Sequence, residues 1–294
     1  MRYSDYGPEY TNYFHARQSR FPILDKLKLR GPWLHILLLV LTFGSTYLLQ
    51  GIWYSLSIVS ILFAHEMGHY LMCRRYGISA TLPYFIPFPF PKLNPFGTLG
   101  AVIKMKGRIP NRRALFDVGI AGPLAGLAVT IPVLIIGLSK SSFIPLSTVP
   151  QGAMGLGDSL LFSQIARLIL GATPEGYDMM LHPMAFAGWA GLFVTALNLM
   201  PIGQLDGGHI LYALFGHKSE TIYKFVMIGF IITCAFWYQG WLLLILLLLW
   251  FGYRHPAPEN DFVPIDTKRK ILGYATFVIF IISFVPQPLY IYGN

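Results

Sequence analysis

Two histidines and a glutamate stand close together in the stretch FAHEMGHYLMCRRYG, residues 63–77. His65 and His69 are four residues apart, so a helix places both imidazoles on one face, with Glu66 beside them. Two neutral imidazole nitrogens can hold Zn²⁺, and an adjacent carboxylate can take a proton from water and later pass it to a leaving amine. The spacing therefore predicts a hydrolytic site with one zinc ion, in which Glu66 is the general base. The alternative is a pair of histidines hydrogen-bonded within a helix bundle.

A catalytic zinc ion usually takes three protein ligands and leaves one position for water. The predicted third ligand is Asp206, in the stretch NLMPIGQLDGGH, where Pro201 and three glycines interrupt an apolar segment. Without a metal, this aspartate would cap a helix. His209, three residues further on, is either a competing ligand or a polar packing group. Asn198 could bind the backbone of an extended peptide substrate, or it could tie two helices together.

The composition places the chain in a lipid bilayer. Of its 294 residues, 54% are hydrophobic and 12% are charged, which leaves too little polar surface for a soluble globule. Apolar runs of about 20 residues or more, long enough to span, cover residues 32–53, 54–73, 114–138, 184–215, 223–253 and 271–289. The fifth run has a polar turn at residues 238–240 and is long enough for two crossings. The predicted fold is therefore an all-α polytopic membrane protein with about six to seven transmembrane helices.

The formal net charge of +9 could indicate a nucleic-acid partner, but the basic residues gather in loops on one side of the apolar runs. This positive-inside pattern predicts no nucleic-acid partner and a multi-pass protein with a cytosolic amino terminus. Arg74 then marks the cytosolic interface, with His69 about 7 Å and His65 about 13 Å deeper along a helix. We expect the plasma membrane of a bacterium rather than an organelle membrane.

Three motifs together resemble the site-2 protease family, the zinc metalloproteases that cleave peptide bonds within membranes. They are HEMGH, the glycine-rich GIAGPLAG at residues 119–126, and NLMPIGQLDGG. Their order and spacing are similar to the three-helix catalytic core of that family and cover about residues 54–215. The resemblance implies that His65, His69 and Asp206 bind zinc, that Glu66 is the general base and that Asn198 lies near the substrate. The proline-rich and aromatic connection after the second helix resembles the plastid and cyanobacterial-type branch.

The family resemblance also implies a short membrane-associated β-hairpin or sheet at TLGAVIKMKG, residues 98–107. Five prolines between residues 83 and 95 exclude a helix before it, and residues 101–106 alternate as a short strand does. An amphipathic interfacial loop is the alternative. The expected domains are a cytosolic tail, residues 1–31, and an integral membrane metalloprotease domain, residues 32–294. Neither a PDZ domain nor a pair of CBS domains, which some relatives carry, is expected.

The small residues of GIAGPLAG predict close packing between helices. Asp117, just before this motif, is expected to complement a helix amino terminus or to pair with Arg113, one turn earlier. No chemistry is assigned to it.

These features predict an intramembrane zinc endopeptidase that hydrolyses peptide bonds in or near the transmembrane segments of single-pass membrane proteins, as in regulated intramembrane proteolysis. Its partners are those substrates and the lipid bilayer. The alternative function is a membrane transporter or metal carrier that uses the same His/Asp cluster. Glu66 discriminates between them, because a carrier needs no base beside its ligands. A catalytically silent membrane-binding protein is a further alternative.

Overall fold

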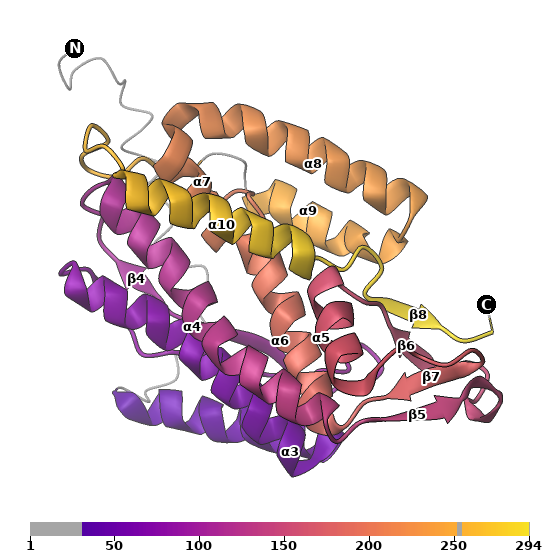
Figure 1. Ribbon diagram of the computed structural model, residues 1–294. Helices are drawn as coiled ribbons and strands as arrows, with labels where there is room; N and C mark the ends of the chain where they lie inside the picture. The colour runs from indigo at the N-terminus through magenta and orange to yellow at the C-terminus, as the bar shows by residue number, and fades with distance from the viewer. Residues whose placement is uncertain (1–30, 252–254, 294) are drawn as a thin grey trace.

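The computed structural model describes residues 31–251 and 255–293. The expected cytosolic tail, residues 1–31, therefore lies outside the described residues except for Gly31. The described part of the chain is mostly helical, and its strands form four two-stranded sheets. Figure 1 shows the helices as a bundle, with the strands β5 to β8 gathered at one end.

The helices are α3 (Pro32–Arg75), α4 (Arg112–Leu138), α5 (Leu160–Leu170), α6 (Pro183–Leu199), α7 (Asp206–Phe215), α8 (Ser219–Phe236), α9 (Leu242–Phe251) and α10 (Thr267–Ser283). Short 3₁₀ turns are η2 (Leu146–Thr148), η3 (Gly216–Lys218) and η4 (Gln239–Trp241). The strands are β1 (Ser79–Ala80), β2 (Tyr84–Pro87), β3 (Thr98–Val102), β4 (Met105–Lys106), β5 (Ser142–Pro145), β6 (Met154–Leu156), β7 (Tyr177–Met180) and β8 (Leu289–Ile291).

Helix α3 is two helices joined at Gly51. Its 44 residues would measure about 66 Å if straight, twice the apolar thickness of a bilayer. Gly51 has φ 79° and ψ −179°, a conformation that residues with a Cβ resist, and the chain reverses direction there (Figure 1). The sequence predicted this boundary three residues later, between Trp53 and Tyr54. The second half of α3 carries the HEMGH motif.

Among the described residues, three helices are long and apolar enough to cross a membrane: Pro32–Arg75, Arg112–Leu138 and Asp206–Phe236, the last of which joins α7 and α8. Shorter apolar helices cover Leu160–Leu170, Pro183–Leu199 and Gln239–Trp250. The chain is a membrane protein. Helices of 10 to 17 residues fall at or below the length that spans a bilayer unaided. The count of six to seven crossings therefore stays a prediction.

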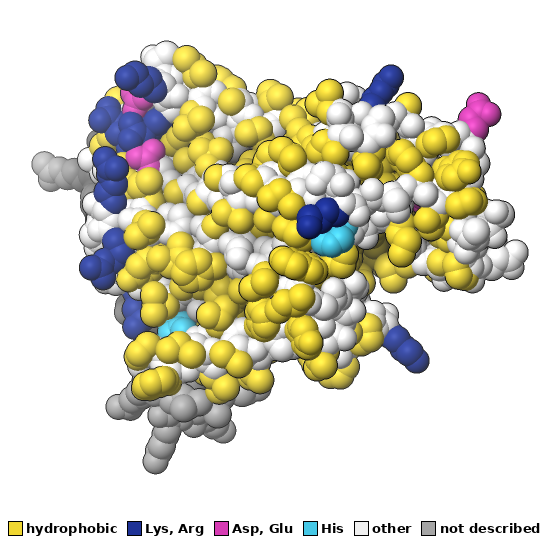
Figure 2. All heavy atoms as spheres, turned by 60° about the horizontal axis from the view of Figure 1, so that its bottom comes forward, with side chains coloured by type: hydrophobic (Ala, Val, Ile, Leu, Met, Phe, Trp, Pro, Cys, Tyr) yellow, Lys and Arg dark blue, Asp and Glu magenta, His cyan; other side chains and the backbone are white. Residues whose placement is uncertain are grey.

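Basic side chains gather at one end of the bundle, where α3 ends and α4 and α10 begin. Figure 2 shows them as a row along one edge, while hydrophobic side chains cover much of the face beside it. Exposed members of this basic end are Arg74, Arg75, Arg113, Lys268 and Lys270. Such an arrangement fits a bundle embedded in lipid whose basic end meets one membrane surface.

Helix α4 occupies the centre of the bundle and contacts α3, α6 and α7. Its neighbours come close because glycines line the contacts. A Cβ on Gly68 of α3 would overlap the carbonyl oxygen of Ala121 on α4, and a Cβ on Gly137 of α4 would overlap the backbone of Ala185 on α6. Backbone-to-backbone approach of this kind is how membrane helices gain packing energy where lipid supplies no hydrophobic driving force.

The connection between α3 and α4 runs alongside α3. Strands β2 and β3 pair antiparallel, with Tyr84 opposite Val102, and β1 pairs with β4. The turn before β3 is fixed to α3, because Ser45 Oγ donates to the Gly97 carbonyl at 2.6 Å and the Tyr54 hydroxyl donates to the Phe96 carbonyl at 3.1 Å. The membrane association of these strands stays a prediction.

The close approach of α4 and α6 gives a test of this packing. We expect Gly137→Ala to lower the free energy of unfolding by about 1–3 kcal/mol, because the added methyl must push α6 away. Gly229→Ala on α8 is the matched control: nothing lies within 4 Å of its Cβ position. It should change stability by about 1 kcal/mol or less, towards greater stability. Thermal unfolding in detergent measures both, and equal melting temperatures for the two variants would contradict the packing described.

Candidate metal centre

His65 and His69 lie in the interior of the second half of α3. Both are buried, as is Glu66, and the two imidazole centroids are 4.9 Å apart. The helix runs without interruption through all three residues. Their spacing of four therefore puts both rings on one face, as the sequence predicted.

Asp206 is brought to this face by the break between α6 and α7. Helix α6 ends at Leu199 and α7 begins at Asp206, and the turn between them contains Gly203 with φ 55°. The next two glycines let the first turn of α7 pack closely against that break. A Cβ on Gly207 would overlap the Leu199 carbonyl oxygen, and one on Gly208 would overlap the Gly203 carbonyl oxygen. The LDGG sequence thus fixes where the Asp206 carboxylate points.

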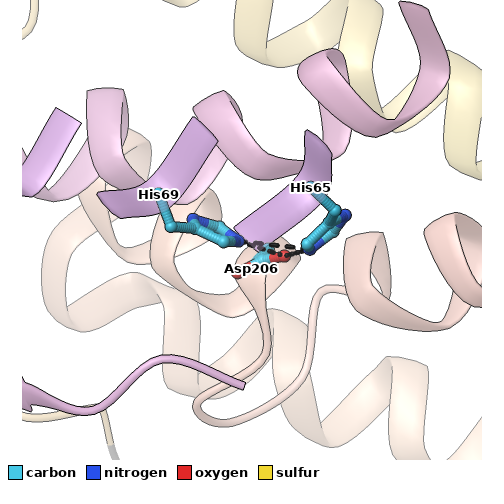
Figure 3. Close-up of side chains that lie close together, drawn as sticks. All are labelled: His65, His69 and Asp206. Atoms are coloured by element: carbon cyan, nitrogen blue, oxygen red, sulfur yellow. Dashed lines mark hydrogen bonds and ion pairs between the residues drawn. The ribbon is translucent and has the colours of Figure 1, made fainter. Parts of the chain in front are cut away.

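Three side-chain atoms from these two elements converge. Asp206 Oδ2 lies 3.3 Å from His65 Nε2 and 3.3 Å from His69 Nε2, and the two imidazole nitrogens are 3.2 Å apart. Figure 3 shows both rings directed at the same carboxylate oxygen. Within the described residues, this is the one group of three or more His, Cys, Asp or Glu side chains that could hold a metal ion.

The spacing of the three atoms fits a zinc ion. Two ligands about 2.0–2.1 Å from a tetrahedral zinc ion are about 3.3 Å apart, and all three distances here have this value within 0.1 Å. Two imidazoles and a carboxylate are also ligands that zinc prefers, and three such ligands leave a fourth position open. The donor set therefore fits one zinc ion.

The backbone of α4 sets the orientation of His69. Its Nδ1 lies 2.8 Å from the Val118 carbonyl oxygen. A carbonyl oxygen can only accept a hydrogen bond, so Nδ1 carries the proton. The lone pair of Nε2 is then directed towards the place where the His65 and Asp206 atoms converge. A metal-binding histidine is usually oriented in this way by its second nitrogen. Both imidazole rings also need a flat surface on α4 that carries no side chains. A Cβ on Gly122 would overlap His69 Nε2, and one on Gly126 would come within 3.2 Å of His65 Nδ1.

Two further predicted residues lie beside these donors. Glu66 is buried, with 8% of the residue exposed, and the backbone of Ile103, between β3 and β4, lies near its carboxylate. Asn198, the last residue but one of α6, has its amide nitrogen 3.3 Å from His65 Nε2. The structure thus brings all five predicted site residues into one region, while their chemical roles stay predictions.

His209 is not part of the three-donor group. Its Nδ1 lies 2.5 Å from His255 Nε2, and His255 Nδ1 in turn lies 2.8 Å from the Pro256 carbonyl oxygen. Tyr212 stacks on the His255 ring at 4.8 Å. Burial and the neighbouring His209 hold the pKa of His255 well below its usual range, so this ring is neutral at pH 7. The polar packing role left open for His209 agrees with these contacts.

Sequence reasoning missed the partners that orient these residues. The Val118 carbonyl is a backbone group, which no side-chain motif marks, and His255 lies 46 residues after His209. Of the two roles expected for Asp117, the pairing with Arg113 is wrong: Asp117 binds Arg269, and Arg113 Nε donates to the Pro264 carbonyl at 2.9 Å. An arginine 152 residues away cannot be chosen over a near one by spacing alone.

The fold and site define a membrane protein whose helix bundle encloses a His–His–carboxylate donor set with a neighbouring glutamate. A profile of Peptidase family M50 matches residues 53–236. The chain belongs to this family, the site-2 protease family.

Curated relatives are similar over most of this chain. A protein of Oryza sativa subsp. indica named probable zinc metalloprotease EGY2, chloroplastic, is 30% identical over 262 residues, which is 85% of this chain and 47% of that protein. The Arabidopsis thaliana protein of the same name is 32% identical over 241 residues, 80% of this chain and 41% of its own length. The A. thaliana protein named probable zinc metalloprotease EGY1, chloroplastic, is 30% identical over 243 residues, which is 78% of this chain and 42% of that protein. The chain thus spans less than half the length of these relatives.

The flat surface of α4 can be tested through zinc binding. We expect Gly122→Ala to weaken zinc binding by about 10- to 100-fold, because its methyl group would displace the metal-facing nitrogen of His69. Gly126→Ala, with its milder contact at 3.2 Å from His65, should have a smaller effect. Competition with a chelating indicator measures both affinities. If Gly122→Ala binds zinc as tightly as the wild type, the orientation of His69 described above is wrong.

The choice of Asp206 over His209 gives a second test of the donor set. Asp206→Ala should purify without zinc, because two imidazoles alone hold the ion weakly, whereas His209→Ala should keep about one zinc ion per chain. Elemental analysis of the purified proteins distinguishes the two. The assignment fails if the zinc is lost with His209→Ala and kept with Asp206→Ala.

Proposed function

We propose that this protein is an intramembrane zinc endopeptidase. The observation that carries this proposal is the convergence of His65, His69 and Asp206 at zinc-ligand spacing, with the buried carboxylate of Glu66 next along the helix. Membership of Peptidase family M50 and the names of the relatives, probable zinc metalloproteases, support it. A metal carrier would use similar ligands but would have no use for a neighbouring base.

Zinc bound here would polarise the scissile carbonyl and make water nucleophilic at neutral pH. His65 Nε2, His69 Nε2 and Asp206 Oδ2 would hold the ion. The Glu66 carboxylate takes the proton of the attacking water and delivers it to the leaving amide nitrogen. Burial beside the connection between β3 and β4 restricts the position of this carboxylate. Burial of the site excludes bulk water, which strengthens each of these electrostatic interactions.

The proposed substrates are transmembrane segments of single-pass membrane proteins, cleaved in regulated intramembrane proteolysis. A peptide bond in a helix is shielded by its own backbone, so the substrate must unwind locally before water can attack. The Asn198 side-chain amide, with both donor and acceptor groups, suits an extended peptide backbone next to His65. The strands β2 and β3 beside α3 offer an edge to which such a peptide can add.

We propose that the basic end of the bundle faces the cytosol and that the amino terminus lies on the same side, in the plasma membrane of a bacterium. The exposed basic residues at that end support this sidedness. An organelle membrane is the alternative, since the relatives are named chloroplastic. Residues 32–294 would form one metalloprotease domain, with its catalytic core at about residues 54–215.

Replacing the proposed base tests the function directly. Glu66→Gln should keep zinc, because Glu66 is not among the three donors, and should lower the cleavage rate by about 10²- to 10⁴-fold. The assay uses the purified chain in detergent with a single-pass model substrate whose transmembrane segment contains helix-destabilising residues. Product is followed by electrophoresis and mass spectrometry.

The matched control is Glu175→Gln, which makes the same chemical change at an exposed glutamate outside the bundle core. It should cleave at the wild-type rate. Unchanged cleavage by Glu66→Gln would refute the role of Glu66. Zinc-loaded wild-type protein that cleaves no membrane-spanning substrate would refute the proposed function.

A further inference from the structure

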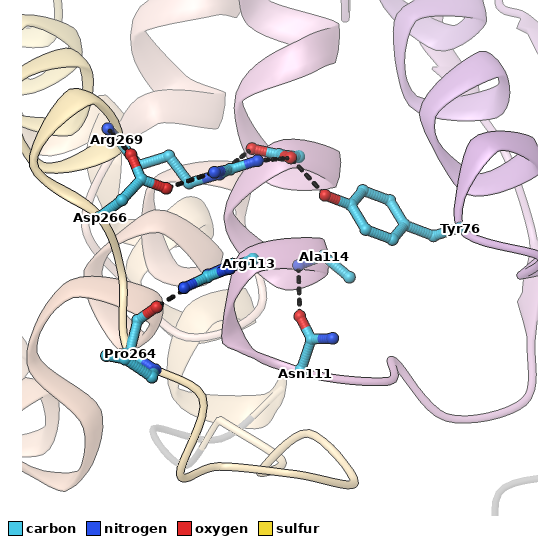
Figure 4. A network of polar contacts seen from close by, with 8 residues as sticks. Tyr76, Asn111, Arg113, Ala114, Pro264, Asp266 and Arg269 are labelled. Carbon is cyan, nitrogen blue, oxygen red and sulfur yellow. Dashed lines mark hydrogen bonds and ion pairs between the residues drawn. The ribbon is translucent and has the colours of Figure 1, made fainter.

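Asp117 joins three separate segments at the basic end of the bundle. Arg269 of α10 makes a bidentate, two-armed contact with its carboxylate: Nε donates to Oδ1 at 2.7 Å, and Nη2 donates to Oδ2 at 2.6 Å. The Tyr76 hydroxyl, just after α3, donates to the same Oδ2 at 2.5 Å. Figure 4 shows Tyr76 and Arg269 reaching one α4 carboxylate from opposite sides. The Asp117 side chain is 17% exposed and the Arg269 side chain 29%, so the pair is mostly shielded from solvent. The two parallel hydrogen bonds also fix its orientation.

The position of Asp117 links this contact to the metal centre. The next residue is Val118, whose carbonyl oxygen accepts the hydrogen bond from His69 Nδ1. One turn further on, Gly122 provides the flat surface against which the His69 ring lies. A shift or rotation of the first turns of α4 would therefore move both the acceptor and the surface that orient His69. Asp117 therefore joins α4 both to α10 and to the residue that follows α3.

The partner in α10 comes from outside the part of the chain that the family profile matches, residues 53–236. Other contacts hold the connection before α10 to the same end of α4. The Glu259 amide donates to the Ile109 carbonyl at 2.9 Å, and Arg113 Nε donates to the Pro264 carbonyl at 2.9 Å. Figure 4 includes this second contact beside Asn111, which caps α4 by accepting from the Ala114 amide. The carboxyl-terminal part of the described chain thus braces α4 where the His69 acceptor lies.

We propose that Asp117 and Arg269 are positioning residues for the metal centre. Their two-armed contact fixes the start of α4, so that the Val118 carbonyl directs His69 Nε2 towards His65 and Asp206. This inference rests on the proposed zinc centre but not on proteolysis itself. It assigns a role in the site to a helix that lies beyond the family-matched residues.

Zinc affinity and a cobalt spectrum test this inference on the full chain in detergent. After removal of metal with a chelator, Asp117→Asn should bind zinc about tenfold more weakly than the wild type, because the acceptor of a metal-binding histidine is displaced. Cobalt bound to this variant should have a visible absorption band altered in position or intensity. Arg269→Gln should behave alike, and the double variant should be no worse than either single one, since both remove the same contact.

The matched control is Asp266→Asn. This substitution makes the same charge change at a residue that also binds Arg269, but the side chain of Asp266 caps α10 and its hydrogen bonds are to Arg269 of that same helix. It should keep wild-type zinc affinity and cobalt spectrum. If Asp117→Asn does not fold, Arg269→Lys, which keeps the charge and loses the two-armed contact, should weaken zinc binding in its place.

Wild-type zinc affinity and cobalt spectrum in a folded Asp117→Asn or Arg269→Lys protein would overturn the inference, even if its melting temperature fell. The same affinity loss in Asp266→Asn would also overturn it, because the effect would then be one of charge or α10 stability. A wild-type chain that binds zinc but cleaves no substrate would refute the proposed protease function. The zinc affinities of the variants would still decide whether Asp117 and Arg269 position the metal centre. A wild-type chain that binds no zinc would overturn both.

Discussion

Three electron-pair donors meet inside an apolar helix bundle, and this arrangement constrains the rest of the structure. Two imidazole nitrogens and a carboxylate oxygen lie within 3.2–3.3 Å of one another. Lone pairs at this distance repel unless a proton or a cation lies between them, and removing them from water is costly in a membrane. A divalent cation offsets both effects at once. Grouping the three side chains concentrates negative potential, and the same geometry binds the ion that neutralises this potential. The bundle can therefore hold these side chains together in its interior.

Much of the backbone near the site serves this convergence. Glycines on α4 leave room for the imidazole rings, and a glycine on α3 lets the two helices approach so that a carbonyl of α4 can accept from His69. The two glycines after Asp206 fold the first turn of α7 back over the end of α6. Each glycine gives up side-chain packing of its own, and the gain is a rigid arrangement of ligands. Glu66 shares that rigidity, because it lies on the same helix as two of the donors and is buried against the β3–β4 connection.

The sequence was sufficient to predict which side chains converge at the site, but not which groups orient them. Helical spacing places His65, Glu66 and His69 together whatever the tertiary structure, and the proline and glycines near Asp206 mark a break that the structure has between Leu199 and Asp206. Long-range contacts carry no such local signal. The pairing of Asp117 with Arg269 spans 152 residues, and a nearer arginine was the obvious candidate. The number of membrane crossings is also not fixed by apolar length, because α3 turns back at Gly51 and several apolar helices are short.

The structure of the site predicts that two imidazoles and one carboxylate hold one zinc ion within this bundle. Zinc K-edge X-ray absorption of the purified chain measures that directly, since it reports the number, distance and type of the atoms around the metal. Zinc held by these residues should show about four light-atom ligands at 2.0–2.1 Å, with the outer-shell scattering of two imidazole rings. Sulfur at about 2.3 Å, or a zinc environment without imidazole scattering, would contradict it.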